Sequence, residues 1–445
     1  MSAGTPGLPE HRGRSLRYGS RLDSYVDRYA ERTLGMTASQ IRALFAVASR
    51  PEVVSLAGGM PTIASLPLDI IGDLMADLVR RDGQHALQYG SGQGDPRLRE
   101  QITEVMQTVG VHGHPDDVVV TVGSQQALDL VTRIFIDPGD TVLVEAPSYV
   151  GALSTFRSYQ AAVHHVAMDE HGLIPEALRE AIRFGKRAGT PAKFLYTIPN
   201  YHNPAGVTQT VGRREEILRI AQVEDLLVVE DDPYGLLGFD GEPPRAIRAD
   251  LDDGVIYLGT FSKTFAPGLR VGWALAPHAV REKLVLAAEA AVLCPPALNQ
   301  FAVSRYLESY DWLGQVKVFR ELYRERRDAM LDALDELLPD GSHWNRPEGG
   351  FYVWVTLPEG LDSQAMLPRA VTDRVAYVPG TAFYSDGFGT RSMRLSYCFP
   401  TPERIREGVR RLAGVVEQEL DLVRTFGPGH LSDRAGLGLP SPDLT

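Results

Sequence analysis

The stretch VVVTVGSQQALDLVTRIF, residues 118–135, contains two structural periods in succession. Its first five residues are almost entirely β-branched and apolar, which is typical of a strand covered on both faces. After Gly123 the apolar residues recur at helical spacing, so a helix is expected over 125–135. A buried strand that runs directly into a helix is the building unit of an α/β sheet.

The same unit recurs along the chain. Further apolar or β-branched runs predict strands at 141–144, 163–167, 194–198, 226–230, 255–259 and 271–274. Segments with a helical period separate most of them, at 149–159, 176–183 and 213–224. This alternation predicts an α/β fold whose large domain holds a mostly parallel seven-stranded sheet covered by helices. Only 260–270 join the last two strands, too short a link for a parallel crossover, so we expect the last strand to be antiparallel.

The sequence pattern changes near residue 299, and a smaller α+β domain is expected from there. Long charged amphipathic segments run through 338, three short strand-like pieces follow, and a last helix is expected at 403–423. We predict an N-terminal arm at 1–35 and a disordered tail at 425–445. Between them we predict an N-terminal part of the small domain at 36–80, a large cofactor-binding domain at 81–298 and a C-terminal part of the small domain at 299–424.

Composition excludes several classes of protein. The chain has 45 basic and 57 acidic residues and a net charge of −12, so it lacks the basic surface that nucleic-acid binding requires. No apolar run approaches the roughly 18 residues of a membrane span. The only cysteines, Cys294 and Cys398, cannot form a disulfide framework or a cysteine-rich zinc site. We expect no nucleic acid or membrane partner, no metal and a cytoplasmic location.

The motif SKTFAPGLRVGW, residues 262–273, follows a predicted strand and carries the strongest chemical signal. A lysine among apolar residues, such as Lys263, loses hydration, which lowers its pKa from about 10.4 and frees the amine as a nucleophile. Ser262 and Arg270 offer a hydroxyl and a forked cation that suit a phosphate group. A cofactor with both an aldehyde and a phosphate, pyridoxal phosphate, fits this set. A surface loop lysine is the alternative, and the spacing alone favours it.

A second motif, EDDPY at 230–234, shifts that balance. Asp231 ends an apolar strand, where a carboxylate is costly unless it has a partner. A protonated pyridine nitrogen is such a partner and keeps the ring an electron sink. Tyr234 is expected to reach the ring hydroxyl, whereas Asp232 is expected only to cap the following turn.

Four further residues have both a functional and an ordinary explanation. Ser124 begins a helix after Gly123, where free N–H groups attract an anion, but it could be a simple helix cap. Asn203, in an Asn-Pro turn, could donate to a ring oxygen or only form the turn. Tyr149 could lie on a ring face or in the core. Arg394, inside an apolar strand, needs either a substrate carboxylate or an internal acid.

Together these motifs resemble the class I/II aminotransferases of the fold-type-I pyridoxal-phosphate superfamily, and within it the α-aminoadipate and kynurenine aminotransferases. The resemblance covers about 36–423 and is carried by the S-K-x-x-x-P-G-x-R-x-G-W, N-P-x-G and D-D-P-Y signatures. It implies a ping-pong transfer of an amino group from an L-amino acid to a 2-oxo acid, 2-oxoglutarate in particular. It also implies a homodimer.

The resemblance further implies roles for individual residues. Lys263 is the implied Schiff-base lysine and proton carrier, and it forms the catalytic set with Asp231 and Tyr234. The implied cofactor contacts are Ser124, Gln125, Tyr149, Asn203, Asp231, Tyr234, Ser262, Lys263, Arg270 and, from the neighbouring subunit, Tyr89. The implied substrate contacts are Arg394 at the α-carboxylate, Gly59, Asn203, Arg42 and Ser39.

Three other functions are alternatives, and each makes a specific demand on the sequence. A β-lyase of the same superfamily would share almost every residue named, and incubation with an amino acid alone would distinguish it. A transcription regulator with an aminotransferase-like sensor domain would need a DNA-binding module, and the 35 residues before Met36 are too few for one. A nicotinamide dehydrogenase would need G-x-G-x-x-G after a strand, and the glycines at 90–94 have a different spacing.

Overall fold

A computed structural model describes Tyr25, residues 28–36 and residues 50–427. Most of the predicted N-terminal arm, almost all of the predicted tail, and both Ser39 and Arg42 lie outside these residues. None of the described helices is long and apolar enough to cross a membrane.

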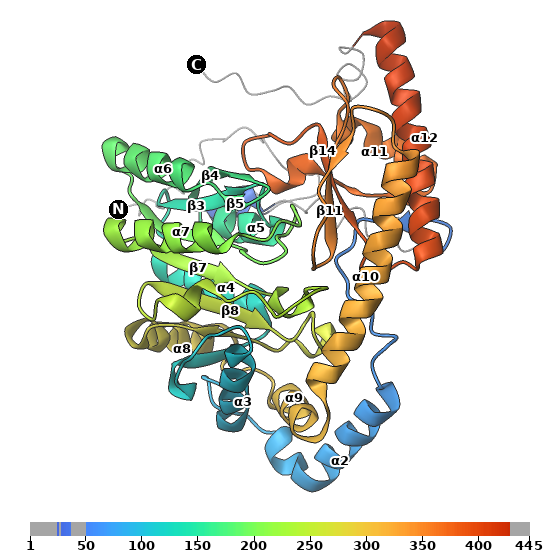
Figure 1. Ribbon diagram of the computed structural model, residues 1–445. Coiled ribbons are helices and arrows are strands. Elements are labelled where there is room, and N and C mark those ends of the chain that lie inside the picture. The colour runs from blue at the N-terminus through green and yellow to red at the C-terminus, as the bar shows by residue number, and fades with distance from the viewer. Residues whose placement is uncertain (1–24, 26–27, 37–49, 428–445) are drawn as a thin grey trace, which may run out of the picture.

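The larger sheet confirms the predicted fold class (Figure 1). Its strand order is β2-β9-β8-β7-β6-β3-β4-β5, and the strands span Val118–Thr121 (β2), Thr141–Ala146 (β3), Ala162–Asp169 (β4), Gly172–Leu173 (β5), Ala192–Thr197 (β6), Leu227–Asp231 (β7), Val255–Thr260 (β8) and Gly272–Leu275 (β9). The pairs β4–β3, β3–β6, β6–β7 and β7–β8 are parallel. As expected, β9 is antiparallel to β8. The short antiparallel strand β5 extends the seven predicted strands by one, because the chain turns back at Gly172 directly after β4.

Helices cover both faces of this sheet. They are α4 (Ser124–Phe135), α5 (Val150–Ser158), α6 (Pro175–Ala188), α7 (Val211–Glu224) and α8 (His278–Val292). Strand β6 shows how its side chains serve two cores: Phe194 and Tyr196 join the core that includes α4 and α5, whereas Leu195 joins the core under α6 and α7. This alternation follows from the two-residue period of a strand, and burial on both faces explains the continuous apolar runs.

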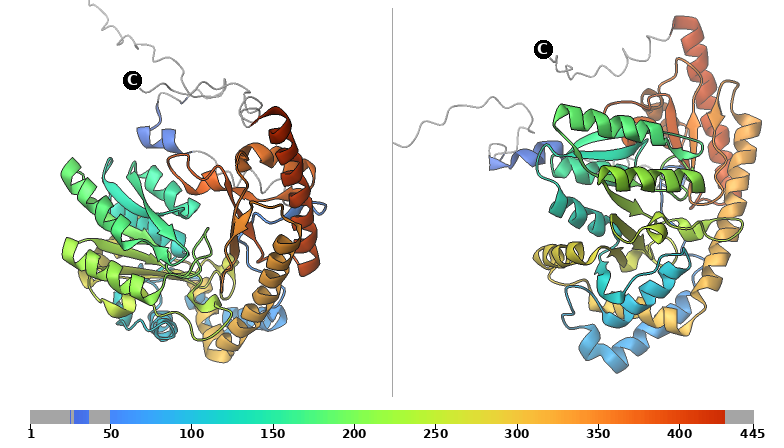
Figure 2. Two further views of the ribbon diagram at one scale, coloured as in Figure 1. Left: turned by 45° about the horizontal axis from the view of Figure 1, so that its top comes forward. Right: turned by 60° about the vertical axis from the view of Figure 1, so that its left-hand side comes forward.

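A smaller antiparallel sheet stands beside the large one (Figure 2). Its order is β10-β11-β14-β13, formed by His343–Trp344 (β10), Tyr352–Thr356 (β11), Val378–Pro379 (β13) and Ser392–Ser396 (β14). Strand β1 (Val54–Ser55) pairs in parallel with β12 (Val375–Ala376), which joins the N-terminal and C-terminal segments of the chain. The remaining helices are α2 (Leu68–Ala86), α3 (Pro96–Gln107), α9 (Ala297–Ser309), α10 (Trp312–Leu337), α11 (Ser363–Thr372) and α12 (Pro402–Phe426).

Six short 3-10 helices complete the described structure. They are η2 (Glu31–Gly35), η3 (Pro115–Asp117), η4 (Gly235–Leu237), η5 (Ile247–Asp250), η6 (Pro267–Leu269) and η7 (Gly380–Phe383). Two of them directly follow strand ends of interest: η4 follows Tyr234, and η6 lies in the link between β8 and β9. Both links therefore hold their side chains close to the carboxyl ends of β7 and β8.

Candidate active site

A cavity of about 410 Å³ opens where the carboxyl ends of β7 and β8 face the smaller sheet. The predicted site residues that line it come from eight separate places in the sequence: Gly59, Ser124, Gln125, Tyr149, Asn203, Asp231, Tyr234, Ser262, Lys263, Arg270 and Arg394. Parallel strands bring their carboxyl ends to one edge of a sheet, which explains why residues so far apart meet there.

Lys263 follows β8 and lies half-buried on the cavity wall. Its Nζ donates a hydrogen bond to the carbonyl oxygen of Gly59 at 3.0 Å and lies 5.6 Å from the centre of the Phe351 ring. Loss of hydration lowers the pKa of Lys263 to about 8, which outweighs the opposing charge of Cys398. A substantial fraction of the amine is therefore neutral near pH 7 to 8 and can act as a nucleophile or base.

Asp231 ends β7 with one carboxylate oxygen bonded and the other unbonded. Its Oδ2 accepts a hydrogen bond from the Tyr196 hydroxyl at 2.7 Å, while its buried Oδ1 has no partner among the described residues. Burial raises the pKa of Asp231 to about 7, with a further contribution from the neighbouring Asp232 charge. An unbonded buried carboxylate oxygen at a cavity wall is a place for a cationic N–H group.

The adjacent Asp232 is committed to the protein itself. Its carboxylate accepts hydrogen bonds from Asn200 at 3.0 Å, from Tyr257 at 3.0 Å and from the backbone N–H of Gly235 at 2.9 Å. The last bond is the turn cap expected from the sequence. Two neighbouring aspartates thus differ in chemistry because only one of them is left unsaturated.

The start of α4 and the loop after β8 together form an anion cradle. Arg270 donates to the Ser262 hydroxyl at 3.1 Å and to the Val122 carbonyl at 3.2 Å, and no acidic side chain in the described structure forms an ion pair with it. Gly123 has φ +79°, and a Cβ there would lie 2.2 Å from Nη2 of Arg270. Glycine is therefore required for the close approach, and α4 begins directly after it with Ser124 and Gln125 on the cavity wall.

Tyr149 and Gln125, the second residue of α4, are bonded to each other on the wall of the same cavity. The Tyr149 hydroxyl donates to Oε1 of Gln125 at 3.2 Å, and Nε2 of Gln125 donates to the Thr155 hydroxyl at 2.9 Å. Burial raises the pKa of Tyr149 to about 12, so the phenol stays neutral and its ring can face a flat ligand.

Arg394 lies in β14 on the small-sheet side of the cavity and is only 2% exposed. It donates to Oδ1 of Asn203 and to the carbonyl oxygen of Ala57, both at 2.8 Å. Its guanidinium carbon lies 4.1 Å from the centre of the Tyr352 ring. No described carboxylate forms an ion pair with it, so this buried cation is oriented for an anionic ligand.

Several cavity residues were missed by the sequence analysis. Among them are Tyr352, Thr260, Ile198 and Pro233, and Tyr196, which bonds to Asp231 without lining the cavity, was missed as well. Each lies in or next to an apolar strand, where the pattern reads as core. Thr260 could have been found from the sequence, because it is a polar residue at the end of an apolar strand. Its hydroxyl donates a hydrogen bond to the Ser262 hydroxyl at 2.9 Å.

Comparison with known proteins now separates the possible enzyme classes. The family model described as aminotransferase class I and II matches residues 52–412. Aromatic-amino-acid aminotransferase 1 of Thermococcus litoralis is 42% identical over 89% of this chain and 95% of its own length. The 2-aminoadipate transaminase of Thermus thermophilus is 39% identical over 87% and 96%. Kynurenine aminotransferase of Pyrococcus horikoshii, solved in complex with PMP, has a TM-score of 0.86 at 40% identity and covers 90% of this chain and 100% of its own.

The chain belongs to the class I and II aminotransferase family. It is a pyridoxal-phosphate-dependent aminotransferase with the fold of its solved relatives, and pyridoxal 5′-phosphate is its cofactor. The predicted family, fold class, cofactor and transaminase activity are thereby confirmed, and the aminotransferase reading fits better than the β-lyase or regulator alternatives.

The cavity fits this cofactor on three independent observations. The unbonded Oδ1 of Asp231 offers a partner to a protonated pyridine nitrogen. The space that a Cβ on Gly123 would fill lies beside Arg270 and suits a phosphate. The amine of Lys263 has the lowered pKa that reaction with an aldehyde requires.

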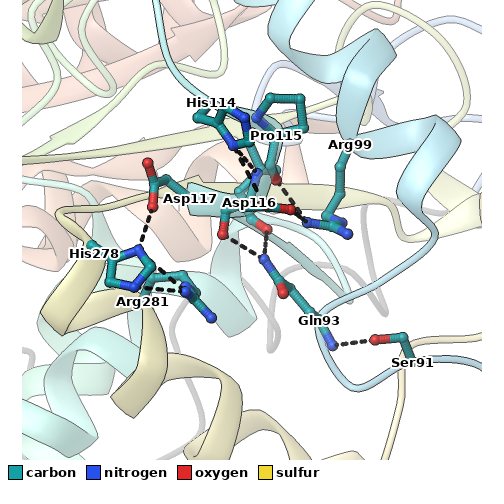
Figure 3. A network of polar contacts seen from close by, with 10 residues as sticks. Ser91, Gln93, Arg99, His114, Pro115, Asp116, Asp117, His278 and Arg281 are labelled. Carbon is teal, nitrogen blue, oxygen red and sulfur yellow. Dashed lines mark hydrogen bonds and ion pairs between the residues drawn. The ribbon is translucent and has the colours of Figure 1, made fainter.

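Tyr89 is the predicted site residue that the described chain does not bring to the cavity. Its side chain is 77% exposed. The loop that carries it is fixed by Gln93, whose Nε2 donates to the carbonyl oxygens of Asp116 at 2.7 Å and Val118 at 2.9 Å. Figure 3 shows this anchor within a polar network that extends to His278 and Arg281. The described residues contain no cluster of side chains arranged to hold a metal ion.

Proposed function

We propose that this aminotransferase moves the amino group of an L-amino acid to 2-oxoglutarate in two half-reactions at the cavity described above. The observation that carries the proposal is the meeting of a nucleophilic amine, an unbonded buried carboxylate oxygen and an unpaired buried guanidinium around one space. Bound pyridoxal phosphate supplies an electron sink. All other functions fall to side chains.

Lys263 is assigned the central role. Its Nζ would hold the cofactor through the aldehyde carbon, and as a free amine of lowered pKa it would take and return the substrate α-proton. Asp231 would hold the pyridine nitrogen in its protonated form, and Tyr234 and Asn203 would donate to the ring hydroxyl. The proposed contacts of the ring face and phosphate are Tyr149, Ser124, Gln125, Ser262 and Arg270.

Arg394 is assigned the substrate α-carboxylate. Asn203 and the Ala57 carbonyl hold its two terminal nitrogens, so the guanidinium meets the substrate in a fixed orientation. Gly59 borders the substrate from the facing loop. Ser39 and Arg42, outside the described residues, stay predicted side-chain contacts.

The proposed assembly is a homodimer in which Tyr89 reaches the cofactor phosphate of the neighbouring subunit. High exposure of this tyrosine on a loop that Gln93 anchors supports the proposal. A cytoplasmic location stays a prediction from the acidic composition.

A panel of amino donors tests the proposal. Relatives are named for aromatic amino acids, 2-aminoadipate and kynurenine, so these donors are assayed first, each with 2-oxoglutarate. The expected result is glutamate formation together with the matching 2-oxo acid. Incubation with a donor alone should stop after one equivalent per active site. Continued turnover without a 2-oxo acid would instead identify a lyase and overturn the proposal.

A further inference from the structure

Tyr352 has a hydroxyl group that lies inside the active site and has no assigned purpose. The residue begins β11, is 3% exposed and lines the cavity. The oxygen of its hydroxyl accepts a hydrogen bond from the Tyr234 hydroxyl, with the two oxygens 3.4 Å apart. In the described part of the chain, no other hydrogen bond involves this hydroxyl.

The Tyr352 ring is confined by three neighbours. The guanidinium of Arg394 lies over its face, 4.1 Å from the ring centre. The loop opposite comes so close that a Cβ on Gly59 would lie 2.0 Å from the Tyr352 hydroxyl oxygen. The Tyr234 ring meets it edge to face, at 6.1 Å and 87°. A ring confined in this way presents its hydroxyl at one place, next to Tyr234.

We propose that Tyr352 is a positioning residue: its hydroxyl donates to the Tyr234 oxygen when Tyr234 donates to the cofactor ring hydroxyl, so that Tyr352 strengthens the Tyr234 hydrogen bond. The inference rests on the proposed role of Tyr234 and adds a residue behind it.

The direction of the chain of donors follows from proton counting. Each phenol carries one hydrogen, and burial raises the pKa of both Tyr234 and Tyr352, so both stay protonated at neutral pH. When Tyr234 turns its hydrogen to the ring oxygen, its own oxygen becomes an acceptor without a donor. Tyr352 lies within reach and can rotate its O–H toward it. Hydrogen bonds in such a chain polarise and strengthen one another.

A stronger donor at the ring oxygen has a measurable consequence. It draws electron density from that oxygen and so lowers the proton affinity of the adjacent nitrogen, which Lys263 contributes. Tyr352→Phe removes only the hydroxyl and keeps the ring under Arg394. We therefore expect this variant to raise the midpoint of the pH titration of cofactor absorbance by about 0.5 pH unit. A residue that only fills space would leave the midpoint unchanged.

A double-mutant cycle isolates the pathway. The titration is measured for the holoenzyme, Tyr352→Phe, Tyr234→Phe and the double variant, with Tyr377→Phe as the matched control. Tyr377 is also a buried phenol of the smaller sheet region, but its hydroxyl donates to the Ser363 carbonyl at 2.7 Å, away from the cavity. We expect a shift on Tyr352→Phe that disappears in the Tyr234→Phe background, and no shift for the control.

The outcomes separate this inference from the proposed function. If Tyr234→Phe shifts the midpoint but Tyr352→Phe does not, the role of Tyr352 is wrong and that of Tyr234 stands. Equal shifts on Tyr352→Phe in both backgrounds also overturn it, because the effect then bypasses Tyr234. If Tyr234→Phe itself leaves the titration unchanged, both proposals fail. Thermal unfolding of each holoenzyme, together with the retained cofactor absorbance, shows that the variants compared are folded.

Discussion

The two halves of the cavity are built on different principles. The large-sheet half, made of Ser124, Asp231, Ser262, Lys263 and Arg270, collects side chains at or just beyond strand ends and leaves Oδ1 of Asp231 without a partner among the described residues. The small-sheet half, made of Gly59, Tyr352 and Arg394, consists of segments that bond or pack against one another and against their neighbours. The first half therefore offers separate strand-end groups to a ligand, and the second half offers one buried cation, Arg394, whose orientation its neighbours fix.

This difference predicts where a substitution will be felt. Substitutions in the large-sheet half should weaken cofactor binding, because they remove side chains that would form hydrogen bonds or ion pairs with the cofactor. Changes in the small-sheet half should act on substrate kinetics at unchanged cofactor affinity. Lys263 is the exception, since it belongs to the first half while its Nζ bonds to the Gly59 carbonyl in the second.

The largest effect is expected for Lys263→Ala, which removes the group shared by both halves. Turnover should fall by at least about 10³-fold because the covalent attachment and the proton carrier are lost together. The purified protein should also lack the yellow colour of the bound cofactor. Lys317→Ala, at an exposed position of α10, is the control and should keep both. A coloured, fully active Lys263→Ala enzyme would refute the site assignment.

Arg394→Lys tests the small-sheet half alone. Lysine keeps the charge but loses the fork that Asn203 and Ala57 orient, so kcat/KM for amino donors should fall about 100-fold, or about 2.7 kcal/mol. Cofactor affinity, measured by fluorescence titration, should stay within about twofold. Arg391→Lys is the control, since Arg391 bonds to the Leu357 carbonyl outside the cavity. A large loss of cofactor affinity in Arg394→Lys would contradict the division into halves.

Asp231→Asn should stabilise the cofactor-free protein more than Asp232→Asn does. In the cofactor-free fold the pKa of Asp231 is raised from 3.8 to about 7, so the folded state binds the extra proton and stability falls as pH rises from about 4 to about 7. Asp231→Asn removes this cost. At pH 8 the free energy of unfolding of the cofactor-free variant should therefore be about 1–3 kcal/mol higher than that of the unaltered protein. Its cofactor affinity should nevertheless be weaker than that of the unaltered enzyme.

Asp232→Asn is the matched comparison. Burial raises the pKa of Asp232 as well, but its carboxylate accepts three hydrogen bonds that an amide replaces only in part. The gain in stability should therefore be about 1–3 kcal/mol smaller than for Asp231→Asn. Denaturant unfolding at pH 8 measures both variants. A change of the same size in both would mean that Asp231 is a structural acid like its neighbour.

The sequence predicted the large-sheet half well for a physical reason. Each of its residues stands at the end of a recognisable strand, and parallel strands bring those ends together, so Lys263, Asp231 and Ser124 could be placed at one edge without coordinates. The last strand was correctly expected to be antiparallel because its link was too short for a crossover. Strand β5 escaped prediction because two residues carry no periodicity.

The site residues of the small-sheet half were harder to predict because their roles depend on contacts between segments that are distant in the sequence. Tyr352 reads as an aromatic residue in an apolar strand, and only folding brings it to Tyr234, 118 positions earlier. Tyr196 was missed for the same reason, since nothing in strand β6 marks which of its aromatic residues meets Asp231. Arg394 was the exception, because a cation within an apolar strand demands a partner.

Gly123→Ala is expected to have the smallest effect and tests the large-sheet half through the backbone. The new methyl group would lie 2.2 Å from Arg270 Nη2 at a φ of +79°. Displacement of Arg270 and backbone strain should cost on the order of 1–2 kcal/mol, which weakens cofactor binding by about tenfold. Titration of the cofactor-free enzyme with pyridoxal phosphate and with inorganic phosphate should show both affinities reduced.

Gly139→Ala separates strain from the loss of the cradle. Gly139 also has a positive φ, +92°, yet a Cβ there would meet nothing within 4 Å. This substitution should lower stability by a similar amount and leave cofactor affinity unchanged. If the two variants weaken cofactor binding equally, the effect of Gly123→Ala is general destabilisation. If only Gly123→Ala weakens cofactor binding, the space beside Arg270 is the anion site. The large-sheet half then binds the cofactor phosphate through Arg270, which forms no ion pair within the described protein.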